Sequence, residues 1–154
     1  MDKAIATALL TIAAVIAVMA LINATIPAVG KGASALTSSN VIATERIRTG
    51  MEMVYVTGNT TSSTVIAWIK NTGSVDIKPI DGGDIILQTP STVTRIPYGS
   101  GAQYWDYTLE DSETDWGPAN TLKITLYLTS LPTGVYTLTY VAHNGIKVSD
   151  IFSV

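Results

Sequence analysis

The sequence predicts an α+β protein in which a long hydrophobic N-terminal α-helix is followed by an antiparallel, immunoglobulin-like β-sandwich. Residues 4–30 contain no charged side chain, and their larger apolar residues recur at helical spacing. After residue 50 the period changes to two, in short segments rich in Val, Ile, Thr and Tyr that Gly, Asn, Asp and Pro separate. We therefore assign residues 1–52 to the helix and residues 53–154 to the sandwich.

The apolar run at the start of the chain is long enough to be a membrane span. Residues 4–22 carry no charge, and a helix needs about 20 apolar residues to cross a bilayer. A secretory signal has an apolar core of only about 7 to 15 residues, so this run is too long for one. A helix that is apolar on every face is covered on every face, by lipid or by other helices.

The composition of this run favours packing between helices, with a plain single-pass anchor in lipid as the alternative. Alanines repeat at intervals of four, a spacing that lets helix backbones approach closely. Larger apolar residues recur at alternating steps of four and three, as in a coiled-coil seam. Asn23 and Thr25 add polar side chains, which within a membrane need hydrogen-bond partners. The expected polymerisation residues are Ile5, Leu9, Ile12, Ala13, Ile16, Ala17, Met19, Ala20, Ala24, Ile26, Leu36 and Ile47.

Helical spacing continues beyond the apolar run. Pro27, Gly30 and Gly32 interrupt the pattern, but residues 33–53 recover it with an apolar stripe and a polar face. We expect one helix that continues to about Gly50, which at 1.5 Å per residue is about 70 Å long. A free-standing helix of that length needs neighbours to cover it.

Seven or eight short strands are expected in the rest of the chain. Their composition and regular spacing are typical of an antiparallel sandwich. The pair Asn144-Gly145 predicts a tight hairpin between the last two strands, and residues 71–73 and 81–84 predict further turns. The segments are residues 51–58, 64–73, 84–89, 91–99, 103–110, 121–130, 135–145 and 146–154.

Nothing in the composition indicates catalysis or a cofactor. The chain has no cysteine, and its one histidine, His143, stands beside a turn. No serine lies in a nucleophile-elbow setting, and no Gly-rich loop leads from a strand into a helix to bind phosphate. The net charge of −3 gives no electrostatic reason to expect nucleic acid. We therefore expect neither an enzyme nor a cofactor.

Two candidate sites in the sandwich have weaker support, one for glycosylation and one for calcium. Asn59 begins an Asn-Thr-Thr glycosylation sequon in a turn, whereas the sequon at Asn23 lies in the apolar helix. An acidic cluster offers oxygen ligands of the kind that calcium takes, although an acid-rich solvated turn is the commoner explanation. The cluster consists of Asp106, Glu110, Asp111, Glu113 and Asp115.

Two segments resemble one protein family. VIAWIKNTGSVDI, residues 65–77, is similar to the strand-turn-strand that opens the head of the archaellins, where an apolar strand ending in Lys-Asn-x-Gly is frequent. GVYTLTYVAHNGIKVSDIF, residues 134–152, resembles the last hairpin of those heads and of the related archaellum stator proteins. An apolar helix before a cysteine-free sandwich also resembles the archaellins, within the wider class of type IV pilin-like proteins. Ile5 stands where bacterial type IV pilins usually carry glutamate, which agrees better with the archaellins.

The resemblance implies a structural subunit of an extracellular helical filament, the archaellum, which serves swimming motility. The subunit would wait in the membrane with its head outside, and a secretion ATPase and a membrane platform would move it into the filament. There the helix would exchange lipid for copies of itself and form a homopolymer.

Three alternatives stay open beside the archaellum filament subunit. An adhesive type IV-like pilin would have the same architecture, and an archaellum stator protein would use the helix as an anchor. A membrane-tethered carbohydrate-binding sandwich is a different class of function, with Trp68, Trp105 and Trp116 as stacking platforms. Core or inter-subunit packing is the more common use of each tryptophan.

Overall fold

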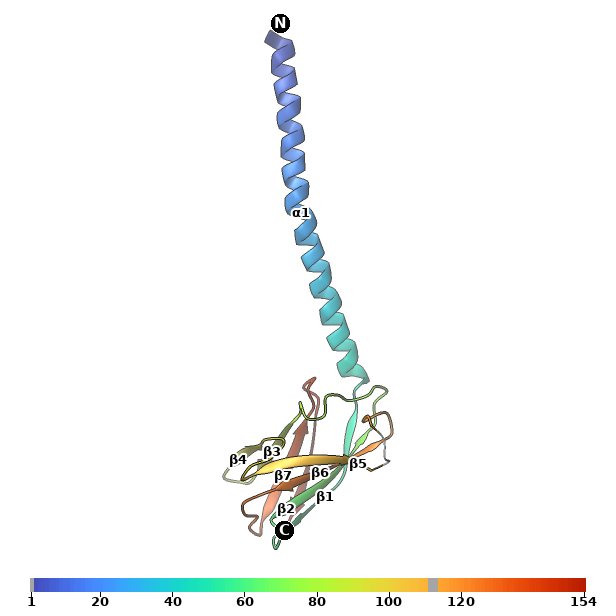
Figure 1. Cartoon of the computed structure of the whole chain (residues 1–154), viewed down its shortest axis with the longest axis vertical. Helices are drawn as coiled ribbons and strands as arrows, with labels where there is room; N and C mark the ends of the chain where they lie inside the picture. Colours follow the sequence, from blue (N-terminus) through green and yellow to red (C-terminus); the bar gives the residue numbers. More distant parts are fainter. Residues whose placement is uncertain (1, 111–113) are drawn as a thin grey trace. The chain divides into compact units, whose positions relative to one another are not determined.

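The long N-terminal helix is present as expected. The computed structural model describes residues 2–110 and 114–154, and in it α1 is continuous over Asp2–Arg48 (Figure 1). Pro27 lies inside α1 and removes only one backbone hydrogen bond, so the helix continues through it and through Gly30 and Gly32. By contacts between Cα atoms the chain divides into Met1–Ile42 and Ala43–Val154, so the last turn of α1 groups with the sandwich.

Eight antiparallel strands follow in the part of the chain that the structure describes, which confirms the predicted immunoglobulin-like sandwich. One sheet has the order β1-β2-β6-β5 and the other β4-β3-β7-β8. This is the order of the immunoglobulin sheets ABED and CFG, with β4 added beside the third strand. The strands are β1 (Met51–Asn59), β2 (Thr64–Asn71), β3 (Asp84–Gln88), β4 (Val93–Ile96), β5 (Tyr104–Leu109), β6 (Thr121–Tyr127), β7 (Val135–Val141) and β8 (Lys147–Ser153).

Alternation along the central strands creates the core. On β2, Val65, Ala67 and Ile69 are fully buried, whereas Ile66 and Trp68 between them face outward. The partners of Val65 and Ile69 on β6 are Leu126 and Leu122. The second sheet contributes its own inward row, and residues of both sheets form a single hydrophobic cluster. Burial of these β-branched and aliphatic side chains supplies the main favourable free energy of the sandwich.

The expected hairpin between the last two strands is confirmed. β7 pairs with β8 from Val141↔Lys147 to Val135↔Ser153, and the N–H of Gly145 donates to the carbonyl of Ala142 at 2.8 Å. Gly145 has a φ of +82°, a left-handed conformation that glycine adopts without a steric penalty. This requirement explains why the Asn-Gly pair in the sequence identifies the turn.

Tyr140 joins the centre of the core to a loop. Its ring lies 6.1 Å from that of Trp105 and 5.8 Å from that of Trp116, both at steep angles, and its hydroxyl donates to the carbonyl of Ile80 at 3.2 Å. A Cβ on Gly83 would lie 2.6 Å from this hydroxyl, so glycine is needed there. Burial, with smaller effects from Tyr107 and Asp81, raises the pKa of Tyr140 above its ordinary value of 10.0.

The raised pKa predicts a loss of stability at alkaline pH. Because the folded chain holds the neutral hydroxyl more tightly than the unfolded chain, its contribution is complete below pH about 10 and is lost as the pH rises above that value. Burial also raises the pKa of Tyr107, so Tyr140→Phe lowers this dependence without abolishing it. Through the lost hydrogen bond it costs about 1 kcal/mol at pH 8. Thermal unfolding of the full chain in detergent between pH 8 and 11 measures both effects.

Tyr136→Phe is the matched control for this prediction. The Tyr136 hydroxyl also donates to a backbone carbonyl, that of Pro132, at 2.8 Å. The control retains Tyr140 and should lose stability with alkaline pH as the natural chain does. An alkaline slope that is the same with and without the Tyr140 hydroxyl would contradict the prediction.

Candidate functional site

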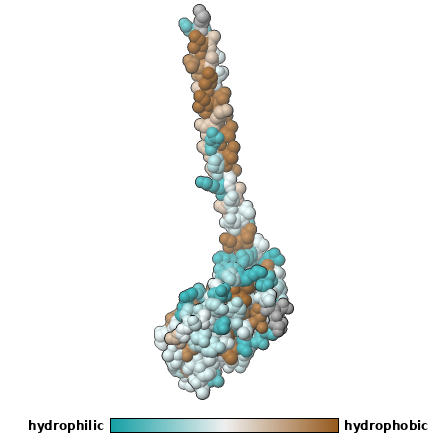
Figure 2. Space-filling view, in the orientation of Figure 1, coloured by the Kyte–Doolittle hydropathy of each residue, from teal (hydrophilic) through white to brown (hydrophobic). Residues whose placement is uncertain are grey.

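The apolar part of α1 is fully available to an external partner. No side chain of residues 2–48 is buried within the part of the chain that the structure describes. Figure 2 shows hydrophobic side chains along the N-terminal half of α1 and more polar ones over most of the sandwich. By length and composition, α1 is long and apolar enough to cross a membrane.

Every residue expected in the polymerisation seam lies on α1 and is exposed. Among the larger ones, the exposed fraction ranges from 57% for Ile12 to 85% for Ile47. The alanines Ala13, Ala17, Ala20 and Ala24 are exposed as well. Their role in packing against other helices stays a prediction.

Threonine hydroxyls in the apolar segment are satisfied within the helix. Thr7 donates to the carbonyl of Lys3 at 2.8 Å, Thr11 to that of Ala8, and Thr25 to that of Leu21 at 2.7 Å. A hydroxyl that bonds back to its own helix needs no partner on another one. Thr25 therefore gives little reason to expect a partner helix. Of the two polar residues in this segment, only Asn23 still supports that expectation.

The last turn of α1 is tied to the loop after β2 through backbone hydrogen bonds. The N–H of Ser74 donates to the carbonyl of Arg48 at 2.9 Å, and Thr72 and Gly73 both donate to the carbonyl of Gly50. The final carbonyls of a helix have no partner within the helix, so the loop satisfies groups that would otherwise need water. We call residues 43–50, together with residues 71–75 and 142–146, the junction.

Asn71 organises this side of the junction from a fully buried position. Its Nδ2 donates to the carbonyls of Val75 at 2.9 Å and Trp116 at 3.0 Å, and its Oδ1 accepts the N–H of Gly73 at 2.9 Å. A Cβ on Gly73 would overlap the carbonyl oxygen of Arg48 and lie 2.5 Å from the N–H nitrogen of Gly50. The Lys-Asn-x-Gly segment, residues 70–73, is therefore where the sandwich contacts the end of α1.

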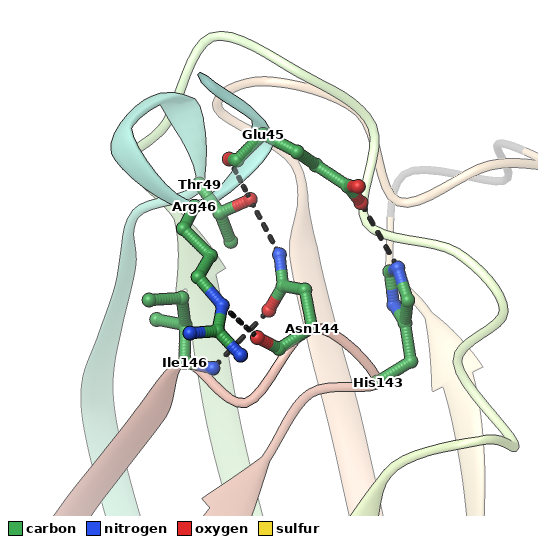
Figure 3. A network of polar contacts seen from close by, with 6 residues as sticks. All are labelled: Glu45, Arg46, Thr49, His143, Asn144 and Ile146. Atoms are coloured by element: carbon green, nitrogen blue, oxygen red, sulfur yellow. Dashed lines mark hydrogen bonds and ion pairs between the residues drawn. The ribbon is translucent and has the colours of Figure 1, made fainter. Parts of the chain in front are cut away.

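The hairpin between β7 and β8 forms the other side of the junction (Figure 3). The buried Asn144 donates through Nδ2 to Thr49 Oγ1 at 2.8 Å, and its backbone carbonyl accepts from Arg46 Nε at 2.8 Å. His143, which the sequence places beside the turn, lies with its Nε2 3.0 Å from Glu45 Oε1. Two hairpin residues thus contact three residues at the end of α1.

These polar contacts differ in how much they contribute to the stability of the fold. The side chains of His143 and Glu45 are 26% and 38% exposed, and such pairs typically contribute about 0 to 1 kcal/mol. The bond between Asn144 and Thr49 is buried, so losing either partner leaves a polar group without water, at a cost of about 1 to 3 kcal/mol. The buried amides, and not the more exposed contact between His143 and Glu45, fix the last turn of α1 to the sandwich.

The tryptophans do not form an exposed platform for sugar. Trp105 and Trp116 are completely buried in the core. Trp68 is half-buried, with its ring 5.8 Å from that of Tyr55 and with Lys123 Nζ 5.7 Å from its centroid. Two of the three residues that the carbohydrate-binding alternative needs are therefore inside the sandwich.

The acidic cluster is engaged in separate contacts where the structure describes it. Asp106 Oδ1 accepts the N–H of Tyr107 at 2.8 Å, and Glu110 lies 3.7 Å from Lys123. Asp111 and Glu113 lie outside the described residues. Within residues 2–110 and 114–154, no three His, Cys, Asp or Glu side chains are grouped to hold a metal ion.

Asn59, the possible glycosylation residue, is exposed at the end of β1. Its Oδ1 accepts the N–H groups of Thr61 at 2.9 Å and Ser62 at 3.1 Å. At the β3–β4 hairpin, a hollow of about 490 Å³ is lined mostly by Thr, Ser, Pro and aliphatic residues, together with Gln103, Gly134 and Tyr136. Its described lining has no Asp, Glu, Lys, Arg or His. Glycosylation of Asn59 stays a prediction.

Comparison with known proteins gives three kinds of match. The sequence model for archaeal-type flagellin matches residues 2–152. An uncharacterised protein of Archaeoglobus fulgidus is 32% identical over an alignment 160 positions long, and the alignment covers 98% of each chain. The archaellum periplasmic stator protein FlaG from Sulfolobus acidocaldarius aligns with a TM-score of 0.60 and 27% identity over 68% of this chain and 99% of that one.

A solved complex gives the same structural match. The stator complex of FlaF and FlaG from Sulfolobus acidocaldarius contains a chain that aligns with a TM-score of 0.56 and 28% identity. The alignment covers 66% of this chain and 87% of that chain. Both matches are long enough to include most of a sandwich of this size.

The geometry of the junction predicts that Asn71 and Asn59, which both bond to backbone groups, differ strongly in how much they stabilise the fold. Asn71→Ala leaves buried carbonyls and an N–H without partners, so we expect a loss of about 3 kcal/mol in the free energy of unfolding. Asn59→Ala also removes two bonds to backbone N–H groups, but water replaces them at that exposed turn, and we expect a loss below about 1 kcal/mol. Urea unfolding of the full chain in detergent, followed by tryptophan fluorescence, compares the two.

Hydrogen exchange shows where the loss occurs. Asn71→Ala should speed exchange at Gly73, Ser74 and the last turn of α1, while the amides of β6 stay protected. Equal losses of stability for the two variants, or unchanged exchange at residues 72–74, would argue against a structural role for the junction.

Proposed function

The chain belongs to the archaeal-type flagellin family, and from this premise we propose that it is a membrane-anchored stator component of the archaellum. It is an archaellum-related structural protein of the cell surface and not an enzyme. The finer proposal is that α1 holds the chain in the membrane while the sandwich stands outside and remains stationary. As functional parts we assign residues 1–52 to the anchor and residues 53–154 to the head.

The single observation that carries this proposal is the extent of the match to FlaG. Almost all of that stator chain, 99%, aligns with this one at 27% identity. The part of this chain left over, about a third, is long enough to include the apolar half of α1. A matched sandwich joined to a span-length apolar helix is the architecture that an anchored periplasmic stator needs.

The junction supports the same proposal on mechanical grounds. A stationary element has to pass force from its head into its anchor without the connection unfolding. Here the last turn of α1 is held by backbone bonds from residues 72–74 and by the buried amides of Asn71 and Asn144. Polar bonds shielded from water resist separation better than exposed ion pairs do.

A filament subunit is the second candidate, and the pattern of α1 favours it. The family description names flagellins, and the exposed alanines repeat at the spacing that brings helices into close contact. In this role the chain would leave the membrane with the help of a secretion ATPase and a membrane platform. Residues 5–47 would then pack against copies of themselves through dispersion contacts, and the sandwich would form the outer surface.

The distribution of the chain between membrane and filament tests the stator proposal. Cells of the host are sheared to remove archaella, and the chain is quantified by mass spectrometry in the filament and membrane fractions. A stator stays with the membrane and is absent from the filament beyond trace amounts, while deletion of its gene abolishes swimming. Recovery of the chain as the main component of sheared filaments would refute the stator proposal and establish the filament subunit.

Overpacking of the alanine stripe gives a second test with a matched control. Because lipid accommodates a larger side chain, Ala13→Leu and Ala17→Leu should leave membrane insertion and swimming unchanged in a lipid-facing anchor. In a packed filament core the same changes add volume at a close contact and block assembly. Val15→Leu lies off the stripe and should be tolerated in both cases. Loss of swimming with Ala13→Leu, but not with Val15→Leu, would contradict an anchor covered by lipid alone.

A further inference from the structure

The stretch of α1 that follows the apolar run has a low intrinsic tendency to form a helix. We call residues 30–40 the polar segment, and Lys31 within it is the first charged residue after Lys3. Seven of its eleven residues disfavour a helix, because glycine loses more backbone entropy and Ser, Thr and Asn side chains compete for backbone hydrogen bonds. They are Gly30, Gly32, Ser34, Thr37, Ser38, Ser39 and Asn40. Although α1 is continuous through the polar segment, this part of the helix has little stability of its own.

Packing within the helical unit does not offset this weakness. The polar segment belongs to Met1–Ile42, a unit that consists of α1 alone. Its side chains are exposed, and a Cβ added to Gly30 or Gly32 would have open space around it. Thr37 donates back to the carbonyl of Ala33 at 3.0 Å, an arrangement that slightly destabilises a helix. Because most helical stability in proteins comes from a packed face, the polar segment depends on its backbone hydrogen bonds.

The two flanks of the polar segment are held more firmly than the segment itself. On its C-terminal side, the junction bonds the N–H of Ser74 to the carbonyl of Arg48 at 2.9 Å and the buried Asn144 to Thr49 at 2.8 Å. On its N-terminal side, lipid would surround the apolar run of the proposed anchor, and a helix in lipid cannot exchange its backbone bonds for bonds to water. Water therefore competes for backbone groups mainly within the polar segment.

We propose that the polar segment is an extensible joint, which opens from helix to coil and closes again while the junction and the membrane span stay folded. The inference rests on the proposed anchor, because copies packed around α1 in a filament would cover the segment. A helix rises about 1.5 Å per residue and an extended chain about 3.3 Å, so full opening lengthens the connection by about 20 Å. A displaced head then extends this segment before it strains the junction or draws the span out of the membrane.

Hydrogen exchange along α1 tests the joint directly. The full-length chain is placed in phosphatidylcholine nanodiscs, and amide exchange is followed by NMR at single residues. We expect the amides of residues 34–40 to exchange about a hundredfold faster than those of residues 10–20 in the span and of residues 46–48 at the junction, because local opening sets the rate. Equal protection along the whole of α1 would overturn the proposal.

Two alanines test whether the composition of the segment causes the opening. Gly30→Ala and Gly32→Ala, combined in one variant, fill open space on the helix, and each change favours the helix about fivefold. The double variant should therefore slow exchange in the polar segment about twentyfold.

Gly134→Ala is the matched control for the double variant. It adds the same methyl group in the loop before β7, where the new Cβ would lie 3.8 Å from the Tyr136 ring, an ordinary contact distance. Exchange in α1 should stay unchanged in this control. An unaltered rate in the double variant, or the same slowing in the control, would show that the glycines do not set the opening and would overturn the proposal.

The outcome also separates this inference from the stator proposal. Fast exchange in the polar segment, together with recovery of the chain in the membrane fraction of sheared cells, supports both. Uniform protection of α1 in nanodiscs overturns the joint and leaves the stator proposal, which the shearing experiment decides by itself. Recovery of the chain as the main filament component would overturn both, because the joint rests on the anchor.

Discussion

A helix without a single charged side chain over residues 4–30 is the constraint on which the rest of this protein depends. Each exposed aliphatic side chain of α1 would cost free energy in water in proportion to its apolar area, roughly 25 cal/mol per Å². A single helix cannot bury its own side chains, and none of those on α1 is buried in the described chain. The helix therefore has to reside in lipid or among other helices, and that requirement places the protein at a membrane or in a polymer.

The hydrogen bonding of α1 suits a lipid environment. Its backbone groups are paired within the helix, and Thr7, Thr11 and Thr25 return their hydroxyl bonds to carbonyls of the same helix. At the C-terminal end of α1, the last carbonyls have no partner within the helix, and the chain enters a sheet. The junction supplies partners there. Asn71 and Asn144 supply bonds at that point from buried positions, so the connection is made of contacts that water does not weaken.

Much of the architecture could be predicted because it follows from local periodicity. The change of apolar period near residue 50 identifies the helix and the strands, and the Asn144-Gly145 pair identifies its hairpin. The turn at residues 71–73 could be recognised, but not its role, because the partners of Asn71 and Gly73 are distant in sequence. A β-bulge at Val54 likewise depends on pairing with β2, and no local signal in the apolar segment around it predicts an extra residue.

What covers α1 in the working protein is the central question, and spin labels on the helix answer it directly. Single labels at Ile12→Cys on the seam and Val15→Cys off it are introduced into the full chain and studied in native envelopes by power saturation. For an anchor in lipid, both labels collide freely with oxygen and are shielded from a water-soluble nickel complex. A label at Ile12 that is shielded from oxygen as well as nickel, beside an oxygen-accessible label at Val15, would show a packed helical core and contradict the lipid-anchored stator.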